Sequence, residues 1–234
     1  MANILLIIPA YNESGNLALL ADRIRRVREF DFDVIVVNDC STDNTAEICA
    51  AHGIPVIDLP VNLGIGGAVQ TGYRYALRKG YDYAVQVDGD GQHRPEDIAK
   101  LLGPLLDDSA DMTIGSRFIA EGDYKSTFAR RIGIRYFSFL LYSLTRQRVT
   151  DPTSGFRACN AKVIALFADR YPVDYPEPES IMVLKRMGLR IREVPVAMQE
   201  RGEGKSSIHS LRSVYYMTKV SLAILIDKMR KQTV

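Results

Sequence analysis

The first half of the chain alternates short apolar runs with stretches in which apolar residues recur at helical spacing. The apolar runs predict five strands, over Ile4–Ile8, Val34–Val37, Val56–Leu59, Tyr83–Val87 and Met112–Gly115. Between the strands, two sets of residues each define the apolar face of a helix: Leu17, Leu20, Ile24 and Val27, and then Ile98, Leu101, Leu102 and Leu105. Because strands that alternate with amphipathic helices form parallel βαβ units, the pattern predicts a doubly wound α/β domain.

The second half predicts more helix than strand. A long helical pattern runs from Phe128 to about Thr145, and a proline-rich loop follows around Pro172 to Pro178. A strand is predicted over Ile191–Val196, before a final amphipathic helix. We therefore expect one domain over residues 1–208 and a C-terminal helix over 209–234.

Polar residues follow the first two predicted strands directly. Pro9 is expected to end the first strand, so that Tyr11 and Glu13 project from the carboxyl edge of the sheet, where open α/β sheets bind ligands. Tyr11 can pack against a base, and Glu13 can accept hydrogen bonds from a base or a ribose. Asp39 follows the second strand and can accept an N–H of uracil or guanine. Capping of the next helices is the alternative for Asn12, Ser14, Thr42 and Asp43.

An acidic motif follows the fourth predicted strand and reads Asp88-Gly-Asp90-Gly-Gln92-His93. Carboxylate oxygens are the ligands that Mg²⁺ and Mn²⁺ prefer, and a pyrophosphate can complete the coordination. An EF-hand calcium loop needs a glutamate at its twelfth position, and counting from Asp88 places Ala99 there, which excludes that alternative. The remaining alternative is a surface turn without a ligand.

Four motifs occur in the order found in a known enzyme family: Pro9-Ala-Tyr-Asn-Glu13, Asn38-Asp39 with Ser-Thr-Asp-Asn-Thr after it, Asn62-Leu-Gly-Ile-Gly-Gly-Ala68, and the acidic motif. Together they resemble family 2 glycosyltransferases of the GT-A fold, over about residues 3–208. Within that family the chain is similar to the dolichol-phosphate mannose synthase and polyprenyl-phosphate glycosyltransferase branch. The resemblance implies a Rossmann-like, mostly parallel sheet flanked by helices.

The resemblance also implies roles for the motif residues. Those expected to bind the nucleotide-sugar are Pro9, Ala10, Tyr11, Glu13, Asn38, Asp39, Gly67, Asp88, Gly89 and Asp90. Mg²⁺ or Mn²⁺ is the expected cofactor, with Asp88, Asp90 and Gln92 as its ligands. Arg201 and Lys205 lie in a glycine-containing segment that resembles a loop closing over the pyrophosphate. A connector before the last helix is the alternative for this segment.

Further positions resemble the acceptor side of these enzymes. Arg117, Arg130 and Arg131 would bind the acceptor phosphate or the donor sugar, because guanidinium groups bind phosphates in a bidentate manner. Asp151 and Ser154 belong to an acceptor-side motif that ends at Arg157 and could also form only a turn.

The acidic residues Glu177 and Glu179 allow three interpretations. An inverting transfer to a hydroxyl requires a base, whereas a phosphate oxygen is already ionised. Glu177 or Glu179 would be that base, would position the acceptor, or would only cap the helix that runs to Met187. With Asp90, Arg117 and Arg131 they complete the expected catalytic set.

Composition limits the partners. The net charge is only +2, so nucleic acid is not an expected partner, and three cysteines without metal-ligand spacing predict neither disulfides nor zinc. Basic residues concentrate in Lys125–Arg148 and in Arg201–Val234. The last helix has Val214, Met217, Val220, Ile224 and Ile226, followed by basic residues, which is typical of a helix that lies on an anionic membrane, binds a small membrane protein, or packs on its own core.

The sequence therefore predicts a non-processive, inverting glycosyltransferase that moves a hexose from a UDP- or GDP-sugar to a polyprenyl phosphate or another lipid-linked acceptor. It is expected in the cytoplasm, peripheral at the inner face of the cell membrane. Alternatives are transfer to a hydroxyl of a surface glycan, or a catalytically silent nucleotide-sugar-binding module. A sugar nucleotidyltransferase would be expected to carry a glycine-rich loop after its first strand, and Pro9-Ala-Tyr-Asn-Glu13 stands there instead.

Overall fold

A single mixed sheet organises the chain. The structure is a computed structural model that describes residues 2–119, 128–173, 175–199 and 210–229, without the side chains of 128–130, 210–216 and 227–229. Within these residues the sheet has seven strands in the order β3-β2-β1-β4-β6-β5-β7. The strands are β1 (Ile4–Ala10), β2 (Asp33–Asn38), β3 (Val56–Asp58), β4 (Tyr83–Gln86), β5 (Met112–Ser116), β6 (Arg157–Asn160) and β7 (Ile191–Pro195). Only β6 runs antiparallel to its neighbours.

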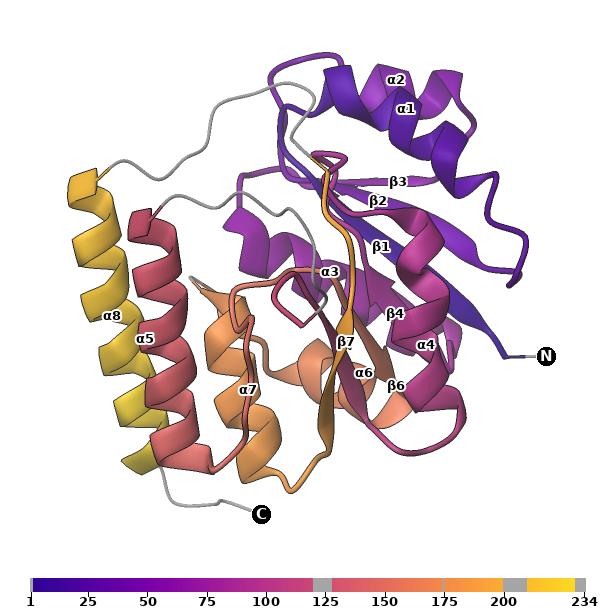
Figure 1. Ribbon diagram of the computed structural model, residues 1–234. Helices are drawn as coiled ribbons and strands as arrows, with labels where there is room; N and C mark the ends of the chain where they lie inside the picture. Colours follow the sequence, from indigo (N-terminus) through magenta and orange to yellow (C-terminus); the bar gives the residue numbers. More distant parts are fainter. Residues whose placement is uncertain (1, 120–127, 174, 200–209, 230–234) are drawn as a thin grey trace.

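Helices cover both faces of the sheet (Figure 1). They are α1 (Ser14–Ile24), α2 (Thr45–Ala51), α3 (Gly64–Lys79), α4 (Ile98–Leu106) after a short 3₁₀ turn at Pro95–Asp97, α5 (Phe128–Thr145), α6 (Ala161–Asp169), α7 (Pro176–Arg186) and α8 (Ser210–Met229). Strand β1 is buried along its whole length, with Leu5 and Ile7 in the core beneath α3, and Leu6 and Ile8 in the core beneath α1 and α4. A strand that is buried on both faces needs an unbroken run of apolar residues, and Ile4–Ile8 is such a run. The predicted doubly wound α/β domain is confirmed.

The predicted strands are confirmed within one or two residues, with two corrections. Pro9 does not end the first strand, because Pro9 and Ala10 still pair with Val37 and Asn38 of β2. The proline-rich segment is a loop only as far as Tyr175, since α7 begins at Pro176, where proline is favoured in the first turn. Strand β6 was not predicted.

The last helix packs partly on the protein itself. Helix α8 contacts α7 and α5, and its Val220 and Ile224 are fully buried in the core. The core alternative is thus confirmed for these two residues, while Leu222, Leu225 and Ile226 remain exposed. The predicted boundary at residue 208 falls outside the described residues and stays a prediction.

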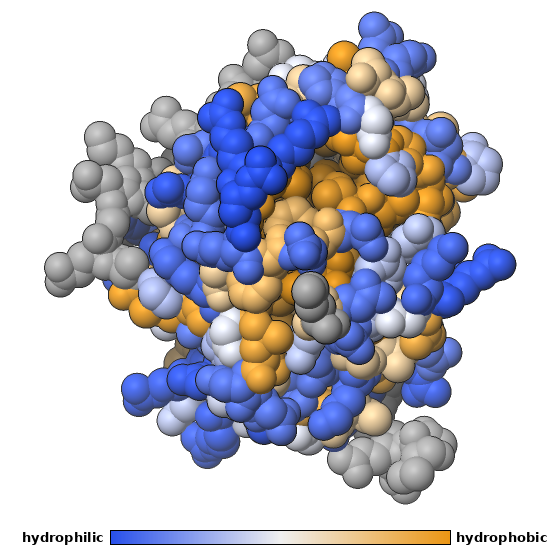
Figure 2. All heavy atoms as spheres, turned by 90° about the vertical axis from the view of Figure 1, so that its right-hand side faces the viewer, coloured by the Kyte–Doolittle hydropathy of each residue, from blue (hydrophilic) through white to orange (hydrophobic). Residues whose placement is uncertain are grey.

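A cavity of about 450 Å³ lies at the amino-terminal ends of β1 and β2. Apolar and aromatic side chains line much of it, among them Phe32, Tyr75 and Tyr81, and none of the predicted site residues does. The face of the molecule that carries the N-terminus shows apolar side chains at its centre, surrounded by hydrophilic ones (Figure 2). This cavity is at the opposite edge of the sheet from the acidic strand ends.

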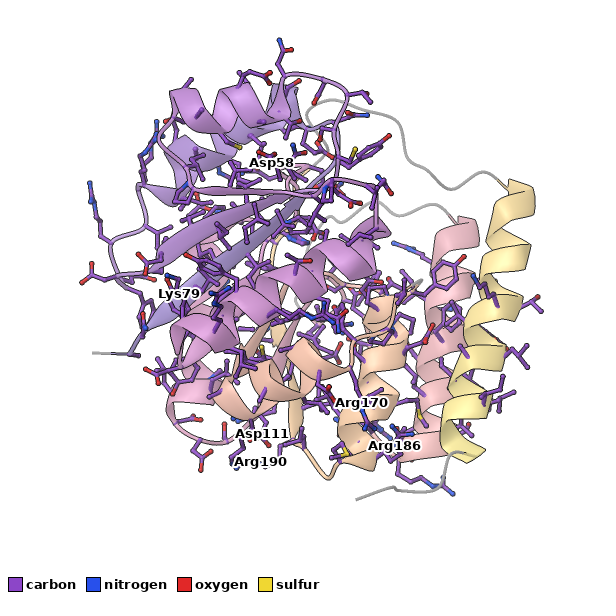
Figure 3. The ribbon with its side chains drawn as sticks, turned by 180° about the vertical axis from the view of Figure 1, so that it is seen from behind. Asp58, Lys79, Asp111, Arg170, Arg186 and Arg190 are labelled. Carbon is purple, nitrogen blue, oxygen red and sulfur yellow. The ribbon has the colours of Figure 1, made fainter. Side chains whose placement is uncertain are left out.

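A buried carboxylate joins the start of β5 to β7. Asp111 accepts hydrogen bonds from the backbone N–H of Arg190 at 2.8 Å, from Arg190 Nε at 3.0 Å and from Asn160 Nδ2 at 2.9 Å. Asp111 and Arg190 lie together in the view from behind (Figure 3). The hydrogen bonds from Arg190 hold the pKa of Asp111 well below its ordinary value. The native state therefore binds a proton at this site less readily than the unfolded chain does.

We expect Asp111→Asn to lower the free energy of unfolding by about 2 kcal/mol at pH 7, because the amide turns a donor toward a guanidinium. A depressed native pKa stabilises the fold above the unfolded pKa, and this contribution is lost as the pH falls through the native pKa. The difference between wild type and variant should therefore shrink below about pH 4. Urea unfolding at pH 7 and pH 3 measures both effects. Asp169→Asn removes an exposed pair with Arg170 and should cost less than about 0.5 kcal/mol; equal losses in the two variants would contradict this role for Asp111.

Candidate active site

The first, second and fourth strands bring three of the predicted motifs together. Strand β1 lies between β2 and β4, and the chain continues these pairings beyond the strand ends. Asp39 N donates to Ala10 O at 2.9 Å on one side, and Gly89 N donates to Pro9 O at 3.3 Å on the other. A side chain on Gly89 would meet Pro9 O at 3.1 Å and Glu13 Cγ at 3.5 Å, so the close approach depends on glycine.

The loops after β1 and β2 are bonded to each other through their side chains. Asn12 N donates to Ser41 Oγ at 2.9 Å, and Asn12 Oδ1 accepts Thr42 N at 2.8 Å. Glu13 N donates to Thr45 Oγ1 at 3.0 Å, and Ser14 N donates to Asp43 Oδ2 at 3.1 Å. Asp43 also accepts Thr45 N, so it serves the starts of both α1 and α2. The capping role expected for Asp43 is thus confirmed and extended, whereas Thr42 donates to Asn12 Oδ1 from both its backbone N and its Oγ1.

Asp39 connects the second strand to the start of α3. Its carboxylate is buried, and Oδ1 accepts Leu63 N at 2.7 Å, one residue before that helix. The side chain of Asn38 donates to Asp58 Oδ1 at 2.8 Å, and its own Oδ1 accepts from Ser41. Gly67 lies in the first turn of α3, and Tyr11 is 49% exposed. These residues form a continuous rim along β2, β1 and α3.

Gln86 binds the Asp88 carboxylate, and His93 binds the Asp88 backbone. Gln86 Nε2 donates to Asp88 Oδ1 at 2.9 Å, and Asp88 N donates to His93 Nδ1 at 3.0 Å. That bond leaves the proton of a neutral His93 on Nε2, which lies 3.6 Å from Asp88 Oδ2. His93 is buried and stacks on Phe156 with ring centroids 4.7 Å apart. His93, the last residue of the acidic motif, therefore contacts Asp88 itself.

The acidic motif fits a divalent cation that a diphosphate helps to bind. Asp88 remains one-third exposed, Asp90 is nearly buried, and Asp90 Oδ1 fixes the turn by accepting Gln92 N at 3.0 Å. Among the described residues no cluster of three or more histidine, cysteine or acidic side chains forms a closed metal site. Two carboxylates with room for phosphate oxygens are the donor set that Mg²⁺ favours over an all-protein cage.

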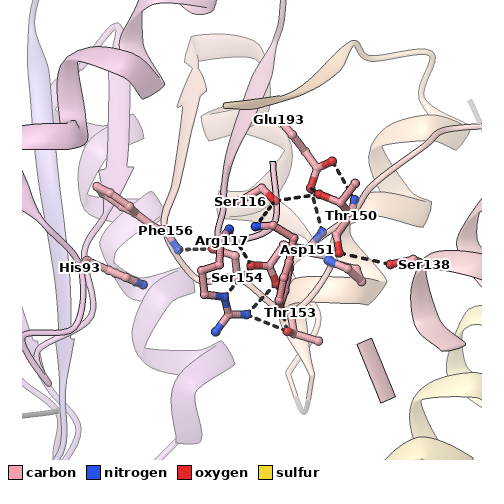
Figure 4. Close-up of polar contacts among 12 residues, drawn as sticks. His93, Ser116, Arg117, Ser138, Thr150, Asp151, Thr153, Ser154, Phe156 and Glu193 are labelled. Carbon is pink, nitrogen blue, oxygen red and sulfur yellow. Dashed lines mark hydrogen bonds and ion pairs between the residues drawn. The ribbon is translucent and has the colours of Figure 1, made fainter. Parts of the chain in front are cut away.

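Arg117 and Asp151 form a buried ion pair on the other side of the site (Figure 4). Asp151 accepts Arg117 Nε at 2.5 Å, Arg117 Nη2 at 2.6 Å and Arg117 N at 3.2 Å. Arg117 Nη2 also donates to Thr153 Oγ1 at 3.1 Å. Both side chains are at most 2% exposed. The charge of Arg117 is thus balanced within the protein.

Arg157 is a fully buried cation whose bonds are to neutral oxygens. It donates from Nε to Ser154 O at 2.8 Å, from Nη1 to Ser180 Oγ at 2.6 Å and from Nη2 to Pro152 O at 3.1 Å. It therefore ties the predicted acceptor-side turn to the first turns of α7. Burial raises the pKa of Glu177, the Arg157 charge lowers it, and the Asp88 charge raises it again. Glu177 thus lies in the electrostatic field of both residues.

The remaining predicted site residues have fewer described contacts with the acidic motif or with the Arg117–Asp151 pair. Glu177 and Glu179 both lie in the first turn of α7, as expected for acids that favour a helix N-terminus. Arg131 is exposed near the start of α5, and Ser154 is buried beneath Arg157. Arg130 belongs to α5, but its side chain is not described, and Arg201 and Lys205 lie outside the described residues.

The sequence patterns gave no role to Gln86 and Glu193, and named Arg157 only as the end of the acceptor-side motif. Arg157 begins β6 and Glu193 lies within β7, and a charged residue in a buried strand is a usable signal. The partners of Gln86 and His93 follow only from the tertiary structure.

The chain is similar to enzymes that use lipid phosphates. It is 34% identical over 214 residues to undecaprenyl-phosphate mannosyltransferase of Micrococcus luteus, covering 88% of this chain and 87% of the relative. It is 31% identical to the UDP-N-acetylglucosamine–dolichyl-phosphate N-acetylglucosaminyltransferase of Methanococcus voltae, covering 82% and 84%, and 31% identical to polyprenol monophosphomannose synthase of Mycolicibacterium smegmatis, covering 93% and 85%.

Solved structures have the same fold. Glucosyl-3-phosphoglycerate synthase of Mycobacterium tuberculosis, in complex with Mn²⁺ and UDP-glucose, matches with a TM-score of 0.73 at 21% identity over 100% of this chain and 82% of that one. Mannosyl-3-phosphoglycerate synthase of Rubrobacter xylanophilus matches with a TM-score of 0.73 at 19% identity, over 100% and 78%. These structures and the chain therefore share one fold, which is the GT-A fold.

The family model of glycosyl transferase family 2 matches residues 5–167. The chain belongs to this family and is a glycosyltransferase. The family, the fold class and the enzyme class expected from the four motifs are confirmed.

Gly155 places the acceptor-side turn directly against Asp88, and this contact is testable. A side chain there would lie 2.7 Å from Asp88 Oδ2 and 3.0 Å from Gln86 Nε2. We expect Gly155→Ala to lower the free energy of unfolding by about 1–3 kcal/mol, because the core must shift to accept it. Gly133→Ala, in helix α5, is the control, since its nearest neighbour is Met217 Sδ of α8 at 4.0 Å, and it should stabilise the fold by up to about 1 kcal/mol. Urea unfolding measures the free energy of unfolding of both variants. A Gly155→Ala variant as stable as the wild type would disprove the contact.

Proposed function

We propose that this glycosyltransferase transfers a hexose, with inversion, from a UDP- or GDP-sugar to a polyprenyl phosphate. The observation that carries the proposal is the Asp88 carboxylate at the carboxyl end of β4, which accepts a hydrogen bond from the Gln86 amide and has no lysine or arginine paired to it among the described residues. The relatives' names support the acceptor, since each names a dolichyl, undecaprenyl or polyprenol phosphate. They name different sugars, so the sugar is left as a hexose.

The rim of β1 and β2 would bind the nucleoside. Tyr11 offers an exposed ring for a base, and Glu13 and Asp39 offer acceptors for base or ribose donors. Because Asp39 Oδ1 already accepts Leu63 N, we assign its Oδ2 to the ligand. Pro9, Ala10, Asn38, Gly67 and Gly89 would form the surface on which the donor lies.

Asp88, Asp90 and Gln92 would hold Mg²⁺ or Mn²⁺. When bound, the cation shields the charge of the leaving nucleotide diphosphate. Gln86 orients the Asp88 carboxylate, as hydrogen-bonding partners of metal ligands do, and His93 fixes the Asp88 backbone by accepting its N–H. Arg201 and Lys205 stay candidates for the phosphates of the donor.

Arg131 is the arginine best suited to the acceptor phosphate. The charge of Arg117 is balanced by Asp151, whereas no described residue forms an ion pair with the exposed Arg131. Arg130 is its neighbour in the chain and would add to the same charge. Asp151 and Ser154 would shape the acceptor side through their bonds to Arg117 and Arg157. A phosphate oxygen is already ionised, so Glu177 and Glu179 would position the acceptor and need not remove a proton.

Replacement of Asp90 tests the proposed function. We expect Asp90→Asn to reduce transfer to undecaprenyl phosphate by about 100-fold or more, because charge stabilisation in the transition state is lost. Radiolabelled UDP-glucose, UDP-N-acetylglucosamine and GDP-mannose, each with Mn²⁺, are the donors. Asp31→Asn, at an exposed position, is the control and should retain full activity.

A second acceptor separates the two proposed classes of transfer. Undecaprenol has the same chain with a hydroxyl in place of the phosphate. Transfer to the phosphate alone supports the proposal. Transfer to the alcohol at an equal rate, or an Asp90→Asn variant with full activity, would refute it.

Helices α5 and α8 would bring the enzyme to its lipid acceptor. They lie side by side at one side of the molecule (Figure 1), and Tyr136 Oη and Ser221 Oγ are 2.8 Å apart. Their exposed apolar residues define a surface that we name the helix-pair surface: Ile132, Tyr136 and Phe139 on α5, and Leu222, Leu225 and Ile226 on α8. Arg131 and Arg135 are exposed on α5 beside it. Among the described residues, no helix has the length and apolar character needed to cross a bilayer. Apolar residues bordered by arginine suit a peripheral contact with an anionic membrane.

Vesicle binding tests the helix-pair surface. We expect Phe139→Ser with Leu222→Ser to reduce flotation with vesicles of phosphatidylglycerol and phosphatidylethanolamine by about 10-fold or more, since two large apolar side chains leave the lipid. Leu19→Ser is the matched control, because Leu19 is 67% exposed on α1, away from this surface. Equal flotation of the double variant and the wild type would exclude the contact, and the alternative of a small membrane protein partner would then be tested.

A further inference from the structure

Glu193 accepts three hydrogen bonds from one short segment of another part of the chain. It lies in β7, next to Ile114 of the parallel strand β5. Its Oε2 accepts Thr150 N at 2.7 Å, and its Oε1 accepts Asp151 N at 2.8 Å and Thr150 Oγ1 at 3.1 Å (Figure 4). One carboxylate therefore binds two consecutive backbone N–H groups, and these belong to residues that lie outside the helices and strands.

A carboxylate is costly at this position. Burial raises the pKa of Glu193, hydrogen bonds from Thr150 and Asp151 lower it, and the nearby charge of Asp151 raises it again. Two neighbouring acidic side chains repel each other unless each is compensated. Arg117 compensates Asp151, and the three donors compensate Glu193. The position of residues 150 and 151 is thus fixed from both sides.

The contacts continue from this segment to the end of β5. Thr150 Oγ1 lies 2.7 Å from Ser116 Oγ, which in turn accepts Phe118 N at 3.3 Å. Arg117 lies between Ser116 and Phe118 in the chain, and Asp151 accepts hydrogen bonds from three of its N–H groups. A shift of the Asp151 backbone would move the guanidinium of Arg117 with it. The influence of Glu193 on Arg117 passes through its bonds to Thr150 and Asp151.

We propose that Glu193 is a positioning residue of the acceptor side: it fixes the Thr150–Asp151 backbone and thereby holds the Arg117 guanidinium in the geometry that sugar transfer requires. The kinetic part of this inference rests on the proposed function, whereas the structural part does not. The side chain acts as a three-bond acceptor, so both its charge and its length matter.

The structural arm follows the Arg117 Nε–H by ¹⁵N NMR. In the wild type this proton is hydrogen-bonded and buried, and it should exchange slowly. Glu193→Gln turns an amide donor toward backbone donors, and we expect it to speed exchange of the Arg117 Nε–H by about 10-fold or more. The Arg157 Nε–H, buried and bonded to Ser154 O, is the internal control and should keep its exchange rate. An unchanged Arg117 signal, or equal acceleration of both arginines, would overturn the proposal.

The kinetic arm compares three variants. Glu193→Gln should lower kcat by about 10- to 100-fold, as expected for a displaced catalytic constellation, with the donor KM and the affinity for UDP or GDP with Mn²⁺ within about twofold of wild type. Glu193→Asp keeps the charge but has a shorter side chain, and should recover part of the lost kcat. Glu47→Gln, exposed on α2, should match the wild type.

The structural and the kinetic experiment can each contradict the proposal independently of the other. A Glu193→Gln variant with wild-type kcat, or one that loses nucleotide affinity to the same degree as kcat, would contradict the positioning role. A wild-type protein that transfers no sugar would refute the proposed function, and the exchange of the Arg117 Nε–H would still decide whether Glu193 holds that guanidinium.

Discussion

The carboxylate of Asp88 is the group on which the geometry of the site depends. Gln86 donates to its Oδ1, His93 accepts the backbone N–H of Asp88, and Gly155 lies directly against the carboxylate. Asp151 is also an acid of the site, but Arg117 neutralises it. Asp88 is one-third exposed and has no lysine or arginine paired to it among the described residues, so we propose it as a ligand of the cation. This contrast between two acids is what distinguishes a ligand-binding group from a structural one.

Strand β6 connects the two halves of the site. It is the antiparallel strand between β4 and β5, and its register pairs Gln86 with Arg157. The turn that precedes it therefore meets the acidic motif that follows β4. Because β6 also pairs with β5, the same strand aligns Asp151 with Arg117, 34 residues away in the sequence. One antiparallel insertion thus brings the proposed acceptor side to the proposed donor side.

The sequence predicts those features that depend on local patterns. The apolar run Ile4–Ile8 could only be a strand buried on both faces, and acids follow β2 and β4 directly. Strand β6 escaped prediction because it is four residues long and contains Arg157, whose charge interrupts the apolar pattern. The pairs Arg117–Asp151 and Glu193–Thr150 join distant segments, so no spacing in the sequence indicates them. Motifs identified the family, whereas the partner of each motif residue required the fold.

Charge is divided across the site in a way that suits group transfer between two phosphates. The rim along β1, β2 and β4 carries Glu13, Asp39, Asp88 and Asp90, which can approach a diphosphate only when a cation lies between them. The opposite side carries Arg117, Arg131 and Arg157, of which Arg117 is neutralised and Arg157 is sealed by neutral oxygens. Of these three arginines only Arg131 is exposed, and it lies with Arg135 beside the helix-pair surface. An acceptor with an anionic head and an apolar chain satisfies both features at once, whereas a soluble glycan hydroxyl would use neither.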